Sequence, residues 1–238
     1  MKAKVLGILG GIGPLASVYF ADLLVNMTQA EKDQEHIPFY LYNDVFIPDR
    51  TDYILGKNSV NPLPELINGI KKLESVGCDY IAVTCNTAHY FYDEMRENSQ
   101  ATVLNIIEEA VDYACKRIGN IKKIGVLATD GTIQSGIYEK VITRRSVEFA
   151  APCPESQKEI MNIIYNQVKA GKQVDIDSFT GIINEMRNEG CDAIILGCTE
   201  LSVINKAYAL SIENADIVDA MEALVIKCIT VFDKKVKE

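Results

Sequence analysis

The chain contains one stretch of sequence twice, and each copy ends beside a cysteine. Residues 77–87 read GCDYIAVTCNT, and residues 190–200 read GCDAIILGCTE. The continuous apolar run after each Gly-Cys-Asp is typical of a strand that is covered on both faces, as in a parallel sheet. Functional residues of open α/β sheets collect at the carboxyl ends of the strands. The repeat therefore predicts two similar α/β units that bring Cys85 and Cys198 to one shared site.

The segments around the two copies alternate between strand and helix patterns. Residues 4–9 and 38–43 are predicted to be strands, and residues 122–129 restart the pattern in the second half. Such alternation predicts an α/β fold with two pseudo-symmetric, Rossmann-like lobes. Each lobe is expected to hold a parallel sheet flanked by helices, and the active site is expected in the cleft between the lobes.

The last amphipathic segment decides how we divide the chain into lobes. A helix is predicted at about residues 215–235, after the second unit is complete, and its apolar face needs a partner. We expect that partner to be the first lobe. The first lobe would then comprise residues 1–100 and 210–238, and the second lobe residues 101–209.

The composition excludes several classes of function. The net charge of −9 argues against non-specific binding to nucleic acid or to an anionic membrane. No apolar run approaches the ~18 residues that would span a bilayer, and the apolar run near the start is too short for a signal peptide. The seven cysteines form no CxxC pair, so neither a disulfide framework nor a metal site is indicated. A cytoplasmic location is expected.

A glycine cluster follows the first predicted strand. It resembles a dinucleotide-binding loop, but the third glycine position of that motif falls on Ala16, and no acidic residue closes the second strand. NAD binding is therefore not favoured, and we expect no cofactor. The cluster is better interpreted as a tight turn, or as a site where backbone N–H groups such as that of Gly11 bind a small carboxylate at a helix N-terminus.

Each cysteine also has a purely structural interpretation, because free cysteine is among the most buried residue types. Cys78 and Cys191 lie at the starts of the two strands and are expected to be small buried hydrophobes. The position of Cys85 and Cys198 at strand ends favours a chemical role for them instead. The role of Cys153, between two prolines, stays open.

The residues that follow the two strand-end cysteines are polar. Asn86, Thr87 and Thr199 are placed to stabilise a thiolate through amide, hydroxyl and backbone N–H groups. His89 lies one turn further along, where it either polarises the site or packs as an ordinary helical histidine.

Four motifs together resemble the aspartate racemases of the aspartate/glutamate racemase superfamily, which need no cofactor. They are GILGGIGP (7–14), IPDRT (47–51), VTCNTAH (83–89) and GCTEL (197–201), in the family's order and over nearly the whole length. Glutamate racemases have a histidine directly after the second Cys-Thr, whereas this chain has Glu200. The resemblance therefore implies interconversion of L- and D-aspartate.

The resemblance also implies roles for individual residues. Racemisation removes a proton from one face of the α-carbon and returns one to the other, so two groups must flank that carbon. Cys85 and Cys198 would be this acid/base pair. The α-carboxylate would be held by Asn86, Thr87 and Thr199, with Thr129 and Thr132 as weaker candidates.

The side-chain carboxylate of aspartate needs a cation. Arg50 in the IPDRT motif resembles the family's substrate arginine, and arginine suits bidentate recognition of a carboxylate. Tyr165 and Lys169 form an i, i+4 pair that resembles the aspartate-specific members. The alternative for Lys169 is a solvated lysine at a helix C-terminus, just before Gly171.

Two other functions stay open. One is racemisation of glutamate or of a broader set of amino acids, within the same superfamily. The other is a non-catalytic, two-lobed protein that binds an acidic amino acid, which the twin cysteines argue against. In each case we expect a small-molecule ligand, no nucleic-acid or membrane partner, and a homodimer.

Overall fold

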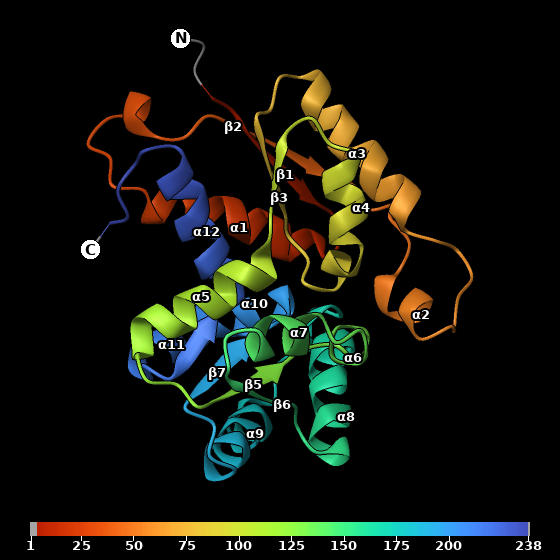
Figure 1. The fold of residues 1–238 in the computed structure, drawn as a ribbon, viewed down its shortest axis with the longest axis vertical. Coiled ribbons are helices and arrows are strands. Elements are labelled where there is room, and N and C mark those ends of the chain that lie inside the picture. The colour runs from red at the N-terminus through yellow and green to blue at the C-terminus, as the bar shows by residue number, and fades with distance from the viewer. Residues whose placement is uncertain (1–3, 238) are drawn as a thin grey trace.

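The computed structural model describes residues 4–237, and eight strands form its framework. Their bounds are β1 (Leu6–Gly10), β2 (Phe39–Asn43), β3 (Tyr80–Val83), β4 (Thr102–Leu104), β5 (Lys123–Leu127), β6 (Glu148–Ala150), β7 (Ala193–Leu196) and β8 (Ile217–Asp219). They pair in parallel into two four-stranded sheets, in the orders β2-β1-β3-β4 and β6-β5-β7-β8. The same strand order in both halves confirms the predicted α/β fold with two similar lobes (Figure 1).

Helices flank both sheets. Their bounds are α1 (Pro14–Met27), α2 (Arg50–Ile54), α3 (Leu63–Ser75), α4 (Tyr92–Glu97), α5 (Ile106–Ile118), α6 (Asp130–Gln134), α7 (Ile137–Thr143), α8 (Pro154–Asn162), α9 (Ile176–Asn188), α10 (Thr199–Tyr208), α11 (Leu210–Glu213) and α12 (Ala220–Val231), with shorter turns η1 (Asp33–Glu35), η2 (Thr87–Phe91) and the π-helical η3 (Ile163–Val168). Local sequence explains several starts. Prolines occupy the first helical positions of α1 and α8, and the side chains of Asn105 and Asp219 cap α5 and α12.

The first cysteine of each repeat packs in the same way in both lobes. A Cβ at Gly7 in β1 would lie 3.1 Å from the Cys78 sulfur, and a Cβ at Gly125 in β5 would lie 3.1 Å from the Cys191 sulfur. Each cysteine therefore fills the space that a glycine of the neighbouring central strand leaves open. Both cysteines are buried, which confirms that they are small core residues.

The ends of the two sheets differ from the sequence expectation. The expected lobe boundaries lay near residues 100 and 210, but β4 joins the first sheet and β8 joins the second. The predicted helix at about 215–235 therefore begins with a strand and becomes helical only at Ala220. Strands of three residues are too short to show an alternating or continuous apolar pattern, so both were missed.

The largest hydrophobic core spans the two lobes. It joins Phe20 of α1 and Ala110 of α5 to Val126 of β5 and Leu224 of α12, and α12 packs against both α1 and α5. α12 therefore packs between the lobes, because α1 belongs to the expected first lobe and α5 to the expected second lobe. The assignment of α12 to the first lobe stays a prediction. None of the helices within residues 4–237 has the length and apolarity that crossing a bilayer requires.

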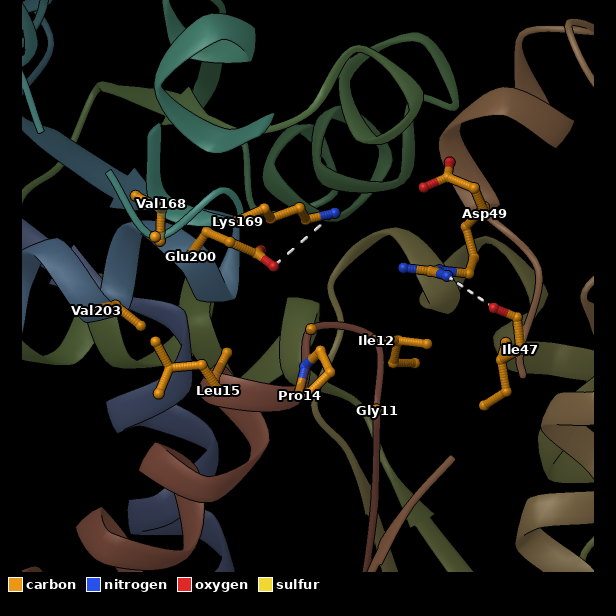
Figure 2. A pocket seen from close by; sticks show the side chains of 14 residues that line it. Gly11, Ile12, Pro14, Leu15, Ile47, Asp49, Val168, Lys169, Glu200 and Val203 are labelled. Atoms are coloured by element: carbon orange, nitrogen blue, oxygen red, sulfur yellow. Dashed lines mark hydrogen bonds and ion pairs between the residues drawn. The ribbon is translucent and has the colours of Figure 1, made fainter. Parts of the chain in front are cut away.

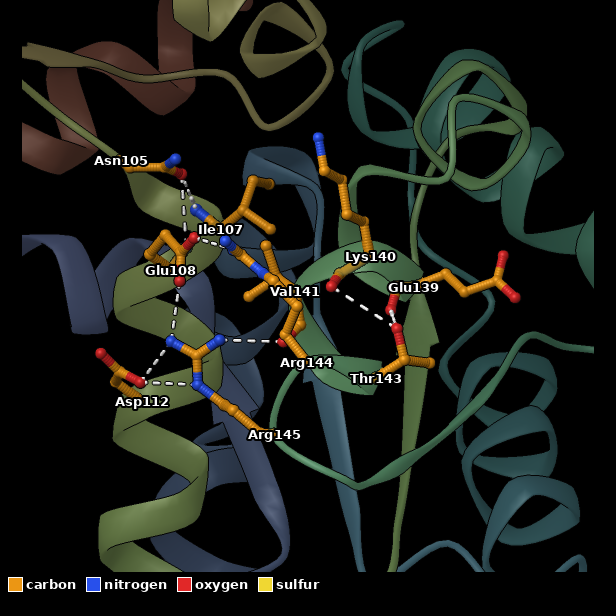
Figure 3. Close-up of polar contacts among 10 residues, drawn as sticks. All are labelled: Asn105, Ile107, Glu108, Asp112, Glu139, Lys140, Val141, Thr143, Arg144 and Arg145. Atoms are coloured by element: carbon orange, nitrogen blue, oxygen red, sulfur yellow. Dashed lines mark hydrogen bonds and ion pairs between the residues drawn. The ribbon is translucent and has the colours of Figure 1, made fainter.

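Within the second half of the chain, ion pairs connect α5 to the residues that directly follow α7 (Figure 3). Arg145 lies 2.7 Å from Glu108 and 2.6 Å from Asp112, and Arg144 also pairs with Glu108. These side chains are partly exposed, so the pairs contribute little to the free energy of folding. Their effect is to fix the direction of α7, which carries Tyr138 toward the site described next.

Candidate active site

Cys85 and Cys198 lie just beyond the carboxyl ends of β3 and β7, at equivalent places in the two lobes. Both are buried, and both line one small cavity of about 10 Å³ between the lobes. Seven of the other predicted site residues line the same cavity: Arg50, Asn86, Thr87, Thr129, Tyr165, Lys169 and Thr199. Gly11 and Thr132 do not.

Arg50 brings a buried cation to this cavity from the first turn of α2. Its Nη1 donates a hydrogen bond to the Pro48 carbonyl at 2.9 Å, while its Nε has no hydrogen-bond partner among the described residues. Burial works against the guanidinium charge, but negative charge at Cys85 and Asp49 outweighs it and raises the pKa of Arg50. A buried cation with a free donor is suited to binding a carboxylate.

Lys169 brings a second cation from the opposite lobe, just after η3. Its Nζ lies 3.9 Å from Glu200 and 4.2 Å from the centre of the Tyr165 ring, and its side chain keeps 27% of its surface exposed. Figure 2 shows Lys169 reaching across the pocket, with Glu200 below it and Asp49 on the far side. Burial lowers the pKa of Lys169, but Glu200 and Tyr165 together raise it. These contacts distinguish Lys169 from a freely solvated lysine at a helix end.

Tyr165 holds the two lobes together at the edge of the cavity. Its hydroxyl donates to Asp49 of the first lobe at 3.4 Å. Burial raises the pKa of Tyr165 to about 12, and Lys169 acts in the opposite direction. Tyr165 is therefore a neutral hydroxyl near pH 7, and it fills the wall beside Lys169.

Glu200 contacts the second cysteine directly. The Cys198 thiol donates to Glu200 Oε2 at 3.0 Å, and the Thr199 hydroxyl lies 3.4 Å from the same oxygen. Burial, followed by the negative charge of Glu200, raises the pKa of the Cys198 thiol well above its usual range. Cys198 therefore rests as a thiol at neutral pH.

Four threonines form the contact between the lobes beneath the cavity. Thr87 lies 3.0 Å from Thr129 and 2.8 Å from Thr132, and Thr51 donates to Thr129 at 3.2 Å. All four are buried. The Thr132 hydroxyl is thus engaged with Thr87 rather than facing the cavity, because the lobes approach each other closely here.

Asn86 has one free end in the cavity wall. Its Oδ1 accepts a hydrogen bond from Tyr138 at 2.7 Å, and its Nδ2 has no partner among the described residues. The bond to Tyr138 fixes the amide so that its donor side is left for another group. This arrangement suits the expected role of binding a carboxylate.

Gly11 differs from the expectation. Its backbone N–H donates to Ser17 Oγ at 3.0 Å, so it is not available to a substrate carboxylate. Its φ of +91° favours glycine, and a Cβ there would lie 2.2 Å from the Asp44 carbonyl oxygen. The tight-turn interpretation of the glycine cluster therefore holds for Gly11.

His89 serves packing rather than chemistry. Its Nδ1 donates to the Cys85 carbonyl at 2.8 Å, and its Nε2 accepts from the Ile106 N–H at 3.3 Å. Burial lowers the pKa of His89, so the ring is neutral at pH 7. It fixes the backbone at Cys85 to the start of α5.

Cys153, at the start of α8, is half-buried, and its sulfur contacts Ser156.

A larger, open pocket of about 400 Å³ adjoins the small cavity (Figure 2). The two share Ile12, Arg50, Lys169 and Glu200. Apolar side chains, among them Leu15 and Val203, make up much of the remaining wall. The open pocket is therefore an entrance that leads to the two cations and then to the two thiols.

Sequence reasoning missed two of the groups that complete this site. Glu200 stands in the GCTEL motif but received no role, although an acid two residues after a candidate cysteine is a usable signal. Thr51 stands in the IPDRT motif but gave no such signal, because only the approach of two distant loops brings it to Thr129.

Comparison with known proteins agrees with this arrangement. The family model described as Asp/Glu/Hydantoin racemase matches residues 9–228. The chain belongs to this racemase family. The resemblance noted in the sequence is thereby confirmed at the level of the family.

Individual relatives differ in the substrate that their names give. The chain is 30% identical to the broad specificity amino-acid racemase RacX of Bacillus subtilis, over 84% of this chain and 86% of that protein. It is 29% identical to a glutamate racemase of Corynebacterium diphtheriae, over 70% of this chain and 62% of that protein. The solved structure of Picrophilus torridus aspartate racemase superposes with a TM-score of 0.85 and 34% identity, covering 98% of this chain and 96% of that one.

Proposed function

We propose that this racemase-family protein interconverts L- and D-aspartate by a two-base mechanism that uses no cofactor. The observation that carries the proposal is the presence of Cys85 and Cys198, one from each lobe, in the wall of a single cavity. Racemisation needs one group on each face of the α-carbon, and two lobes with equivalent cysteines supply that arrangement. Arg50 and Lys169 in the same wall fit a substrate that carries two carboxylates.

In this mechanism one cysteine acts as thiolate and the other as thiol. The thiolate takes the α-proton, and the thiol on the opposite face donates its own proton to the resulting carbanion. Negative charge then moves from the first sulfur through the substrate to the second. The Asn86 amide and the Arg50 guanidinium are fixed in place before the reaction, so they stabilise this charge without reorganising.

The two cations support an acidic substrate over a neutral one. Each carboxylate of aspartate can pair with one cation, and binding then replaces water around both charges. A neutral amino acid offers a single carboxylate and leaves one cation without a new partner. Its binding is therefore weaker by the loss of a charge-assisted contact.

A broader substrate range is the second candidate. The open pocket of about 400 Å³ leads directly to Arg50 and Lys169, so a longer side chain has room beyond the small cavity. The relative from Bacillus subtilis is named a broad specificity amino-acid racemase, and other relatives are named glutamate racemases. The binding-protein alternative would need neither cysteine.

The test is an assay of racemisation without added cofactor, on aspartate, glutamate and alanine. We expect activity with aspartate to exceed that with the other two. Cys85→Ala and Cys198→Ala should each lower activity by at least about 10³-fold, because each removes the only group on one face.

Cys78→Ala and Cys191→Ala are matched controls, because these cysteines lie at the opposite ends of the same strands. They should keep near-normal activity at a modest cost in stability. Substantial racemisation by either Cys85→Ala or Cys198→Ala would rule out the two-base mechanism. Binding of aspartate without any racemisation by the wild type would favour the binding-protein alternative.

We further propose that the protein acts as a cytoplasmic homodimer. Phe46 and Leu15, which are 83% and 63% exposed, are large apolar side chains that contact with a second copy would cover. Light scattering on the purified chain gives its mass in solution. A monomer at micromolar concentration would contradict the proposed dimer.

A further inference from the structure

Glu200 is the charged residue of the cavity that the proposed mechanism leaves without a task. Its side chain is buried, and its Oε2 accepts the hydrogen bond of the Cys198 thiol at 3.0 Å. Its Oε1 lies 3.9 Å from Lys169 Nζ. On the first lobe, a Cβ at Gly13 would come within 2.5 Å of that oxygen, so the carboxylate lies directly against the glycine backbone. The carboxylate is therefore confined to one place beside the thiol.

The other groups around Cys198 do not supply a second negative charge. Tyr138 and Tyr165 have pKa values raised by burial, so both hydroxyls are neutral at pH 7. Lys169 favours the thiolate, as does the position of Cys198 at the start of α10. Burial and the Glu200 charge oppose both and outweigh them, which leaves the thiol as the stable form.

The other cysteine faces the opposite charge. Cys85 shares the cavity wall with Arg50, and negative charge at Cys85 is one cause of the raised pKa of Arg50. A cation beside a sulfur favours the thiolate, and a carboxylate beside a sulfur favours the thiol. The two sequence-related cysteines therefore have different charged neighbours, Arg50 for Cys85 and the Glu200–Lys169 pair for Cys198.

We propose, building on the racemase function above, that Glu200 is a positioning residue that keeps Cys198 in the thiol form between turnovers. The resting pair is then unequal, with Cys85 as the base and Cys198 as the acid. The enantiomer that presents its α-proton to Cys85 meets an enzyme that is ready to react. The other enantiomer must first wait for the proton to move from Cys198 to Cys85.

The proton count of one turnover is balanced. Cys85 takes the α-proton and becomes a thiol, while Cys198 gives its proton to the opposite face and becomes a thiolate. The new thiolate then lies about 3 Å from the Glu200 carboxylate, and two like charges at that distance repel strongly. Cys198 regains a proton from solvent and Cys85 releases one to solvent, which restores the resting pair.

The direct test is the ionisation of each cysteine in the free protein. Cysteine labelled with carbon-13 at Cβ reports thiol ionisation by NMR, and the Cys85→Ala and Cys198→Ala spectra assign the two signals. In Glu200→Gln, the amide keeps the size of the side chain but removes the charge. We expect the ionisation midpoint of Cys198 to fall by roughly one pH unit or more.

The matched control is Glu189→Gln, which removes the same charge from the exposed end of α9 and should move neither midpoint. In racemisation assays, the high-pH limb of the kcat/KM profile should shift to lower pH in Glu200→Gln, because Cys198, the acid of the pair, then loses its proton at a lower pH. A Cys198 midpoint that stays at its wild-type value in folded Glu200→Gln would overturn the proposal.

Two further outcomes are separable. If Glu200→Gln does not fold, Glu200→Asp tests the same contact, because the shorter side chain withdraws the carboxylate from the Cys198 thiol and should lower the Cys198 midpoint. A midpoint that fails to fall would then overturn the proposal. The NMR measurement uses no substrate, so the expected shift in a protein that racemises no amino acid would refute the proposed function alone.

Discussion

We propose that acidic specificity depends most on a single residue, Arg50. Its guanidinium is buried, is held by a backbone carbonyl, and keeps one donor free. We expect Arg50→Ala to lower kcat/KM for aspartate by about 10²–10³-fold, because a buried carboxylate would then lack its cation. Arg50→Lys keeps the charge but loses the planar fork, so it should recover only part of the activity. Equal kinetics for Arg50→Ala and wild type would remove Arg50 from the site.

We propose that Lys169 contributes less than Arg50 to the recognition of aspartate, and acts more selectively, since its side chain is partly exposed. We expect Lys169→Ala to lower kcat/KM for aspartate by about 10-fold, and to lower that for alanine less. The measurement is the ratio of kcat/KM for aspartate to kcat/KM for alanine, because loss of the contact between Lys169 and Glu200 affects both values alike. A ratio that does not change would show that Lys169 does not read the side-chain carboxylate.

Residue patterns in the sequence predicted the centre of the site better than its surroundings. Cys85, Cys198 and Arg50 stand in local motifs, and the repeat places both cysteines at strand ends, so their meeting follows from the topology. The Gly11 N–H donates to Ser17 in the following helix, and the orientation of Thr132 depends on the distance between two separate loops. No local pattern records such distances, and the structure differs from the expectation at both residues.

At the scale of secondary structure, long strands and helices were predictable and short ones were not. β1, β3, β5 and β7 are continuous apolar segments, and each agrees with the sequence pattern. β4, β6 and β8 have three residues each, and neighbouring strands rather than local sequence stabilise them. The expected lobe boundaries near residues 100 and 210 were drawn without these short strands and stay a prediction.

The junction between α10 and α12 carries an electrostatic cost. Asp219 is fully buried, and its Oδ2 and Glu222 Oε1 both accept hydrogen bonds from Asn205. Burial, followed by the charge of Asp219, raises the pKa of Glu222 from 4.5 to about 7. A raised carboxyl pKa destabilises the folded state as the pH rises through that interval, because the unfolded chain releases the proton first.

Glu222→Gln should therefore stabilise the fold at pH 8, since it removes one of two neighbouring charges and keeps the acceptor oxygen. We expect a gain on the order of 1–3 kcal/mol in the free energy of unfolding at pH 8, and a much smaller gain at pH 4.5. Urea denaturation at the two pH values measures this difference. An equal effect at both would contradict the assigned origin of the pKa shift.

At the scale of the whole molecule, the site exists only because two lobes share one core. The largest hydrophobic cluster contains residues of both sheets, and the threonine contact joins the lobes beneath the cavity. The two cysteines are thus held in one cavity by packing that extends through the molecule. Because each lobe supplies one cysteine, the proposed acid/base pair needs the complete fold.

The most direct test of the two-base proposal is the position of deuterium after a short reaction in D₂O. L-Aspartate is incubated with the protein and no added cofactor, and both enantiomers are separated at low conversion. We expect the D-aspartate to carry deuterium at the α-carbon and the remaining L-aspartate to carry almost none, because one cysteine removes the proton and the other delivers a different one. D-Aspartate that retains the original proton, or L-aspartate that exchanges as fast as product forms, would contradict a two-cysteine mechanism.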